Sequence, residues 1–79
     1  MSNRGYENIM QKKYDQAIAD LSQAIRLNPN DAAVYHKRGA AYARKGDCDR
    51  ALADYNQAIK IDPNYALAYN DRGAAYARK

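Results

Sequence analysis

The chain has few residues of the kinds that perform chemistry, and His36 and Cys48 are each the only one of their type. A metal site needs several His, Cys or carboxylate ligands at short spacings, and no such set surrounds His36 in the sequence. Cys48 stands where Tyr14 stands in the preceding copy of an internal repeat. This equivalence predicts a small, partly buried packing residue rather than a nucleophile, because no base is positioned beside it.

Aspartates recur with the period of the same repeat, Asp15 with Asp49 and Asp20 with Asp54. Favourable interactions with helix dipoles and with solvent explain such recurrence better than a pair of catalytic carboxylates. We therefore expect these four side chains on the surface. The sequence also contains no phosphate-binding loop and no hydrolase nucleophile motif. It favours a protein that is not an enzyme and uses no cofactor and no metal.

Basic residues alternate with tyrosines around Arg38, Tyr42, Arg44 and Lys45, and the formal net charge is +4. Such side chains are able to contact phosphates and to stack on bases. The charges are spread along the chain, however, and the regular spacing of Tyr42 and Tyr76 assigns these rings to packing. Nucleic acid is therefore a disfavoured partner.

A repeat positions all of these residues. Residues 38–45 and 72–79 have the same eight letters, and a shift of 34 positions matches 21 of 45 aligned positions. Gly5, Gly39 and Gly73 fall in register. A fixed period of this length indicates a structural unit that buries its apolar face against its neighbours. We expect each of these glycines to allow close helix packing.

Within each period, apolar residues recur at helical spacing in two segments. The Asn28-Pro29-Asn30-Asp31 sequence separates them, with Asp31 as an N-cap, while Gly46 and Asp47 suit the end of one helix and the start of the next. The sequence predicts five helices and no strands. The expected helices span 2–12, 14–27, 32–45, 48–61 and 66–78.

The second period resembles a tetratricopeptide repeat, whose pattern of aromatic, Gly, Tyr, Ala and Pro positions it matches. The matching residues are Tyr35, Gly39, Tyr42, Ala51, Tyr55, Ala58 and Pro63, whereas Arg38 stands where the family usually has Leu. The resemblance implies an all-α, right-handed α-solenoid of antiparallel helical hairpins. It divides a single array over 1–79 into repeat one, 1–31, repeat two, 32–65, and a partial repeat three, 66–79, which is the first helix of a third repeat.

Composition sets limits on where the protein acts. No apolar run approaches the length of a membrane span, and no signal-peptide pattern is present, which predicts a soluble protein with no membrane partner. A single cysteine forms no internal disulfide. This is compatible with a reducing compartment such as the cytoplasm, without establishing one.

The family resemblance implies a non-enzymatic module that binds a protein or peptide on its concave face, formed by the first helix of each repeat. The implied partner-binding residues are Asn3, Tyr6, Ile9, Met10, His36, Lys37, Ala40, Arg44, Asn70, Asp71, Ala74 and Arg78.

Some relatives in this family capture the C-terminal carboxylates of chaperones with a set of Lys, Asn and Arg side chains. At the corresponding places this chain has Ser2, Tyr6, Lys37, Leu67 and Asp71. Asp71 would repel a carboxylate where an arginine is needed, so we do not expect that activity.

An alternative function is self-association. The sequence stops after the first helix of the third period, so Tyr69, Gly73 and Tyr76 form a stripe without its usual neighbour. Either the chain is a fragment or another molecule covers this stripe. We expect the stripe to be exposed in a monomer, and dimers or larger homo-oligomers to form at high concentration.

Overall fold

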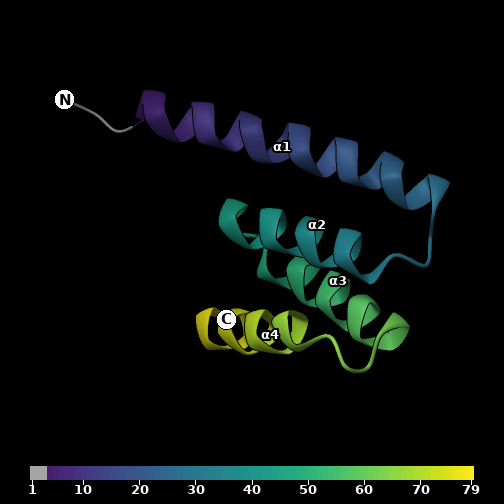
Figure 1. The fold of residues 1–79 in the computed structure, drawn as a ribbon. Helices are drawn as coiled ribbons and strands as arrows, with labels where there is room; N and C mark the ends of the chain where they lie inside the picture. Colours follow the sequence, from purple (N-terminus) through teal and green to yellow (C-terminus); the bar gives the residue numbers. More distant parts are fainter. Residues whose placement is uncertain (1–3) are drawn as a thin grey trace.

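The computed structural model describes the backbone of residues 4–79 and the side chains from residue 12 onward. This part of the chain contains helices α1 (Arg4–Leu27), α2 (Ala32–Lys45), α3 (Cys48–Ile61) and α4 (Ala66–Arg78), and no strand (Figure 1). The predicted all-α class is confirmed.

The turn signals act as the sequence predicts. The Asp31 carboxylate accepts a hydrogen bond from the backbone N–H of Ala33 at 3.1 Å, which caps α2. Gly46 ends α2 with φ 97°, in the left-handed region that glycine adopts without steric cost. Asp47 then caps α3 by accepting from the N–H of Arg50 at 3.2 Å. These contacts fold α2 and α3 into a tight antiparallel hairpin.

One expected helix boundary is wrong. The predicted helices 2–12 and 14–27 form a single helix, α1, which runs without a break from Arg4 to Leu27. The positions equivalent to Gly46 and Asp47 hold Lys12 and Lys13, which provide neither a left-handed glycine nor an N-cap. The helix therefore continues, and α1 lies beside the shorter helices as one long rod (Figure 1).

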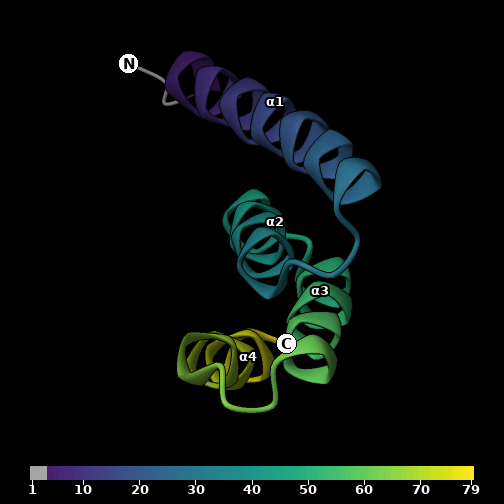
Figure 2. The same ribbon diagram turned by 45° about the vertical axis from the view of Figure 1, so that its right-hand side comes forward.

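The helices form a stack in sequence order. α2 packs between α1 and α3, and α3 packs between α2 and α4, while α2 and α4 also touch. Figure 2 shows α2 and α4 on one side of the stack and α3 on the other. The buried core is rich in alanine and centres on Tyr55, with Ala51, Leu52 and Ala75 packed around it. Small side chains let the helices approach closely, and one buried tyrosine fills the remaining space.

Close packing at Gly39 is confirmed. A Cβ atom there would lie 2.7 Å from Cε1 of Tyr55 and 3.2 Å from the carbonyl oxygen of Ala51. The same expectation is wrong for Gly73, where a Cβ atom would meet no other atom within 4 Å, because no described helix follows α4. The prediction for Gly5 falls outside the described residues, because side chains are described only from residue 12 onward.

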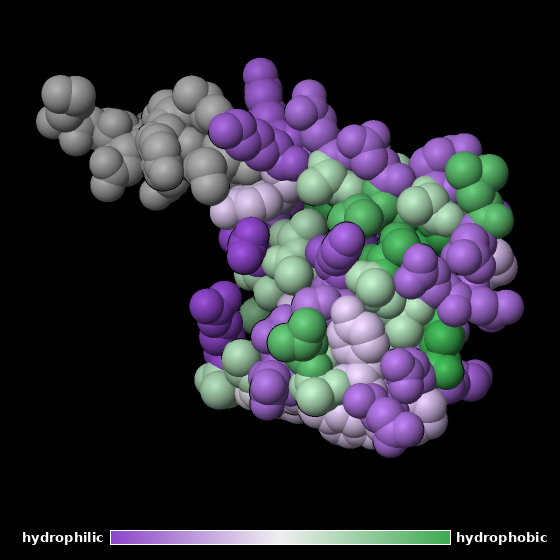
Figure 3. Space-filling model, viewed as in Figure 1, coloured by the Kyte–Doolittle hydropathy of each residue, from purple (hydrophilic) through white to green (hydrophobic). Residues whose placement is uncertain are grey.

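The exposed apolar surface is small and scattered. On the face seen in Figure 3, hydrophobic surface gathers near the end of α1 and is elsewhere interrupted by polar side chains. Tyr69 is 42% exposed and Tyr76 is 56% exposed, which confirms the expected exposure of this stripe on α4.

No helix in the described residues is long and apolar enough to cross a membrane.

Candidate functional site: a groove between α2 and α4

A shallow groove lies between α2 and α4, with Tyr55 of α3 at its base. Its volume is about 170 Å³, below the roughly 300–1,000 Å³ that is usual for small-molecule sites. Apart from Asp71, both walls come from the repeated sequence Arg-Gly-Ala-Ala-Tyr-Ala-Arg-Lys, so each helix contributes alanines and one arginine. The lining residues are Ala40, Ala43, Arg44, Tyr55, Asp71, Ala74, Ala75 and Arg78.

Arg44 and Arg78 carry the positive charge of the groove, and both are exposed. Among the described residues neither guanidinium takes part in an ion pair. Burial raises the pKa of the Tyr55 hydroxyl to about 12, and the negative charge of Asp71 acts in the same direction, while the two arginines oppose it. The hydroxyl is therefore neutral at physiological pH, so the charged groups of the groove are the two arginines and the Asp71 carboxylate.

His36 is partly buried and contacts an aspartate and two tyrosine rings. Its Nε2 pairs with the carboxylate of Asp71, which joins α2 to α4. The imidazole ring also lies 5.9 Å from the Tyr55 ring and 5.4 Å from the Tyr65 ring, measured between centroids. The contact between His36 and Asp71 helps to hold the two walls of the groove in register. The Asp71 side chain remains 43% exposed.

The structure brings together only part of the predicted binding surface. Ala40, Arg44, Asp71, Ala74 and Arg78 line the groove, and His36 joins them through Asp71. Lys37 and Asn70 are exposed but do not line it. The remaining candidates lie outside the described side chains, and these are Asn3, Tyr6, Ile9 and Met10.

Sequence reasoning missed three groove residues, Ala43, Ala75 and, the largest of them, Tyr55. Its place in the apolar stripe of α3 assigned it to the core, and the side chain is indeed only 2% exposed. It reaches the groove because Gly39 lets α3 approach α2 closely. The recurring glycine was the available signal, since it marks where a large side chain from the next helix fits.

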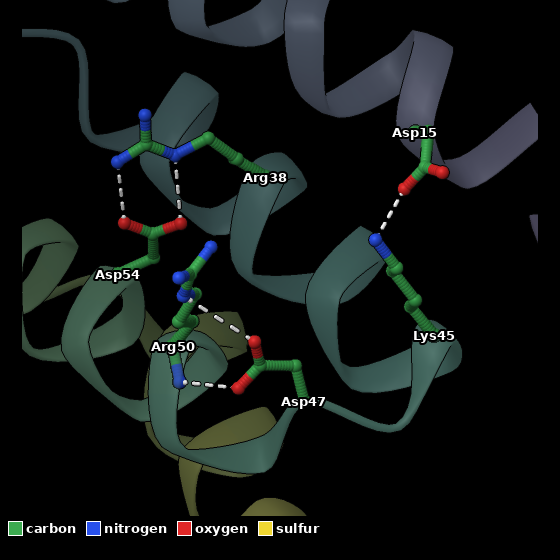
Figure 4. A network of polar contacts seen from close by, with 6 residues as sticks. All are labelled: Asp15, Arg38, Lys45, Asp47, Arg50 and Asp54. Atoms are coloured by element: carbon green, nitrogen blue, oxygen red, sulfur yellow. Dashed lines mark hydrogen bonds and ion pairs between the residues drawn. The ribbon is translucent and has the colours of Figure 1, made fainter.

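The expectation that Asp54 lies on the surface is wrong. Asp54 is 5% exposed and accepts two hydrogen bonds from Arg38, at 2.8 Å from Nε and 2.7 Å from Nη2 (Figure 4). Hydrogen bonding to Asp54 raises the pKa of Arg38, against the opposing effect of burial. A bidentate pair of this kind stabilises the planar guanidinium. It explains how α2 accommodates an arginine where the repeat family usually has leucine.

The same arginine contacts the preceding helix. Nη1 of Arg38 donates to the hydroxyl of Ser22 in α1 at 3.1 Å. The contact recurs one period later, where Nη1 of Arg72 donates to the side-chain oxygen of Asn56 in α3 at 3.0 Å.

An ion pair between neighbouring helices also recurs one period later. Lys45 in α2 pairs with Asp15 in α1 (Figure 4), and one period later Lys79 pairs with Asp49 in α3 at 2.7 Å. All four residues are exposed, as expected for these two aspartates. Together with the arginine contacts, this recurrence shows that the second half of α1 packs on α2 in the register in which α3 packs on α4.

Cys48 is partly buried, as predicted. In the portion of the chain whose side chains are described, no three His, Cys, Asp or Glu residues gather closely enough to hold a metal ion.

The stacked helices define a helical-repeat protein. A family model described as TPR repeat matches residues 5–46 and again residues 41–79. The chain belongs to the tetratricopeptide repeat family, whose repeats generally mediate protein–protein interactions. It is 46% identical over 43 residues to the Hsp70-Hsp90 organizing protein of Triticum aestivum. That match covers 54% of this chain and 7% of the relative, so the chain spans only a small part of the relative's length.

Proposed function

We propose that the groove between α2 and α4 binds an acidic segment of a protein partner, and that the protein performs no chemistry of its own. The observation that carries this proposal is the pair of exposed arginines, Arg44 and Arg78, at equivalent places on the two walls. Guanidinium groups bind carboxylates through two parallel hydrogen bonds, which gives both affinity and orientation.

The floor of the groove favours an extended peptide. Alanines at 40, 43, 74 and 75 leave room for a peptide backbone to approach, and the groove is too small for a bulky ligand. Asp71 lines the groove as well, beside His36, so the two arginines outnumber the one carboxylate and leave the groove with a net positive charge. Because the array is short, binding should be weak and should depend on salt.

The partner need not be a chaperone. The wheat relative is named for organizing Hsp70 and Hsp90, but Asp71 lies in this groove and repels a carboxylate placed beside it. We therefore propose acidic side chains spaced along a segment, which would meet Arg44 and Arg78, rather than a chain terminus beside Asp71.

The test uses a fluorescein-labelled peptide of alternating Glu and Leu, with a Lys and Leu peptide as the ligand control. We expect the double variant Arg44→Glu with Arg78→Glu to bind the acidic peptide at least about tenfold more weakly, measured by fluorescence anisotropy at low salt. Arg50→Glu and Lys60→Glu, introduced together, serve as the charge-matched control, because both residues are exposed on α3 and neither lines the groove. Circular dichroism verifies that each variant is folded. Equal affinity of the double variant and the unmodified chain would place the binding site elsewhere.

Self-association is the second candidate function. It is favoured by the exposure of Tyr69 and Tyr76 and by the open space beside Gly73, all on one stripe of α4. This stripe does not overlap the groove residues, so both functions are compatible with one molecule.

A further inference from the structure

In the described structure, α4 does not make the contact with a following helix that the same eight residues make in α2. In α2, Arg38 holds the Asp54 carboxylate with two hydrogen bonds, and Gly39 receives the Tyr55 ring. In α4, the equivalent Arg72 donates to Asn56 and lies 5.2 Å from the centroid of the Tyr69 ring. Among the described residues, no carboxylate forms an ion pair with Arg72.

α1 carries the complementary face. Asp20, Leu21 and Ala17 stand one period before Asp54, Tyr55 and Ala51. Asp20 is exposed, and within the described part of the chain it forms no ion pair.

The register of α1 explains which way this face points. Ser22 and Asp15 contact the following helix, as Asn56 and Asp49 do one period later. Asp20 therefore lies on the face that α3 turns toward its preceding helix, where Asp54 meets Arg38. Within the described residues no helix packs on this face of α1, because α1 is continuous and its first half does not fold back over the second.

We propose that two copies of this chain associate head to tail, with α4 of one copy packed on residues 14–27 of α1 in the other. The contact repeats the α2 and α3 hairpin between molecules. Arg72 pairs with Asp20 of the second copy, Gly73 receives Leu21, and Tyr76 lies against Ala17. This inference rests on the second candidate function and names the surface that receives α4.

A second copy fits better than an unrelated partner for two reasons. Residues 72–79 are identical to residues 38–45, so α4 presents the same side chains that already bind a helix of the α3 type. The receiving helix shares the period, the aspartate and the small residue of α3. Because the two surfaces differ, the interface is heterologous, and it leads to a chain of molecules or to a closed ring.

Charge reversal tests the pairing directly. The mass of the unmodified chain, measured by size-exclusion chromatography with light scattering from micromolar to millimolar concentration, should rise with concentration. Arg72→Asp and Asp20→Arg should each stay monomeric, because each places like charges at the contact. An equimolar mixture of the two variants should associate again, because every contact between unlike chains then joins opposite charges. Arg72 of one variant meets the intact Asp20 of the other, and the introduced Asp at 72 meets the introduced Arg at 20. The chain that carries both changes should also associate, because its reversed charges remain complementary.

Two further variants complete the design. Lys37→Asp changes the net charge by the same amount as Arg72→Asp, at an exposed place on α2 outside both surfaces, and should associate like the unmodified chain. Gly73→Leu should block association while circular dichroism remains unchanged, since nothing lies within 4 Å of a Cβ at this position. This variant keeps the test valid if a charge reversal disturbs folding.

The outcomes separate the two levels of the proposal. A monomer at millimolar concentration would overturn both self-association and the head-to-tail contact. Association that persists in Arg72→Asp, Asp20→Arg and Gly73→Leu would overturn this interface and leave self-association through another surface. A mixture of the two charge variants that stays monomeric, although each is folded, would also overturn the pairing of α4 with α1.

Discussion

The same eight residues occur in two environments, at 38–45 and at 72–79, and only one side of the helix is alike in the two. Ala41 and Ala75, which face the preceding helix, are both buried, at 7% and 2% exposure. On the opposite side Gly39 is buried against Tyr55, whereas Gly73 is exposed. The sequence therefore defines two packing faces on each helix, and the presence of a neighbour decides whether each face is buried.

The comparison also separates the contribution of helix propensity to stability from the contribution of tertiary contacts. The helix propensity of the two segments is the same, because the residues are the same. Any difference in the cost of an equivalent substitution must come from tertiary contacts. Variants made in pairs, one period apart, measure those contacts directly.

The largest difference is expected at the aspartates. Asp54→Ala should lower the free energy of unfolding by about 3 kcal/mol, because it leaves the Arg38 guanidinium partly buried without its carboxylate. Asp20→Ala, the matched variant in α1, should change it by less than about 0.5 kcal/mol, since Asp20 is exposed. Urea unfolding followed by circular dichroism at micromolar concentration measures both. Equal losses would contradict the assignment of Asp54 as the carboxylate on which the hairpin depends.

A somewhat smaller difference is expected at the glycines. Gly39→Leu should lower the free energy of unfolding by about 1–3 kcal/mol through overpacking against Tyr55 and the Ala51 backbone. Gly73→Leu should not destabilise the monomer, because a side chain there meets no neighbour. It should raise the free energy of unfolding by up to about 0.8 kcal/mol, because leucine has a higher helix propensity than glycine. Thermal unfolding at low concentration distinguishes them. A Gly39→Leu variant as stable as the unmodified chain would mean that α2 and α3 pack less closely than described.

The smallest effect near neutral pH is expected for Tyr55→Phe, which becomes visible only in alkali. The pKa of Tyr55 is raised from 10.0 to about 12 in the folded protein. Between these two values the unfolded chain loses the Tyr55 proton first, so ionisation stabilises the unfolded state and stability falls as the pH rises. Tyr55→Phe should remove that part of the loss. Parallel stability curves from pH 9 to pH 12 for both proteins would rule out this contribution of Tyr55.

Several features of the fold could be predicted because they depend on neighbouring residues in the chain. Asp31, Gly46 and Asp47 mark helix ends through local hydrogen bonds and a left-handed backbone, and the period located the packing glycine at 39. The break expected near residue 13 failed for a local reason as well. Lys12 and Lys13 lack the chemistry that ends α2, and the resemblance to the second period outweighed that signal.

The candidate site was harder to predict because it depends on contacts between helices. Periodicity placed Arg44 and Arg78 at equivalent positions, and the structure brings both to one groove. It did not reveal that Asp71 contacts His36, or that Asp54 is buried, because both depend on pairs 16 to 35 residues apart in sequence. An aspartate on a helix looks the same in sequence whether solvent or an arginine faces it.

The sequence by itself determined the period, the helical class, the helix caps of the α2 and α3 hairpin, and the two apolar faces of each repeated helix. These properties follow from residue spacing and from backbone chemistry within a few residues. Only the tertiary structure decided that α1 is continuous beside α2, that Arg38 holds Asp54, and that Gly73 remains open while Gly39 is filled. The physical reason is that burial and ion pairing require a second helix at contact distance, and identical residues differ wherever that neighbour is present or absent.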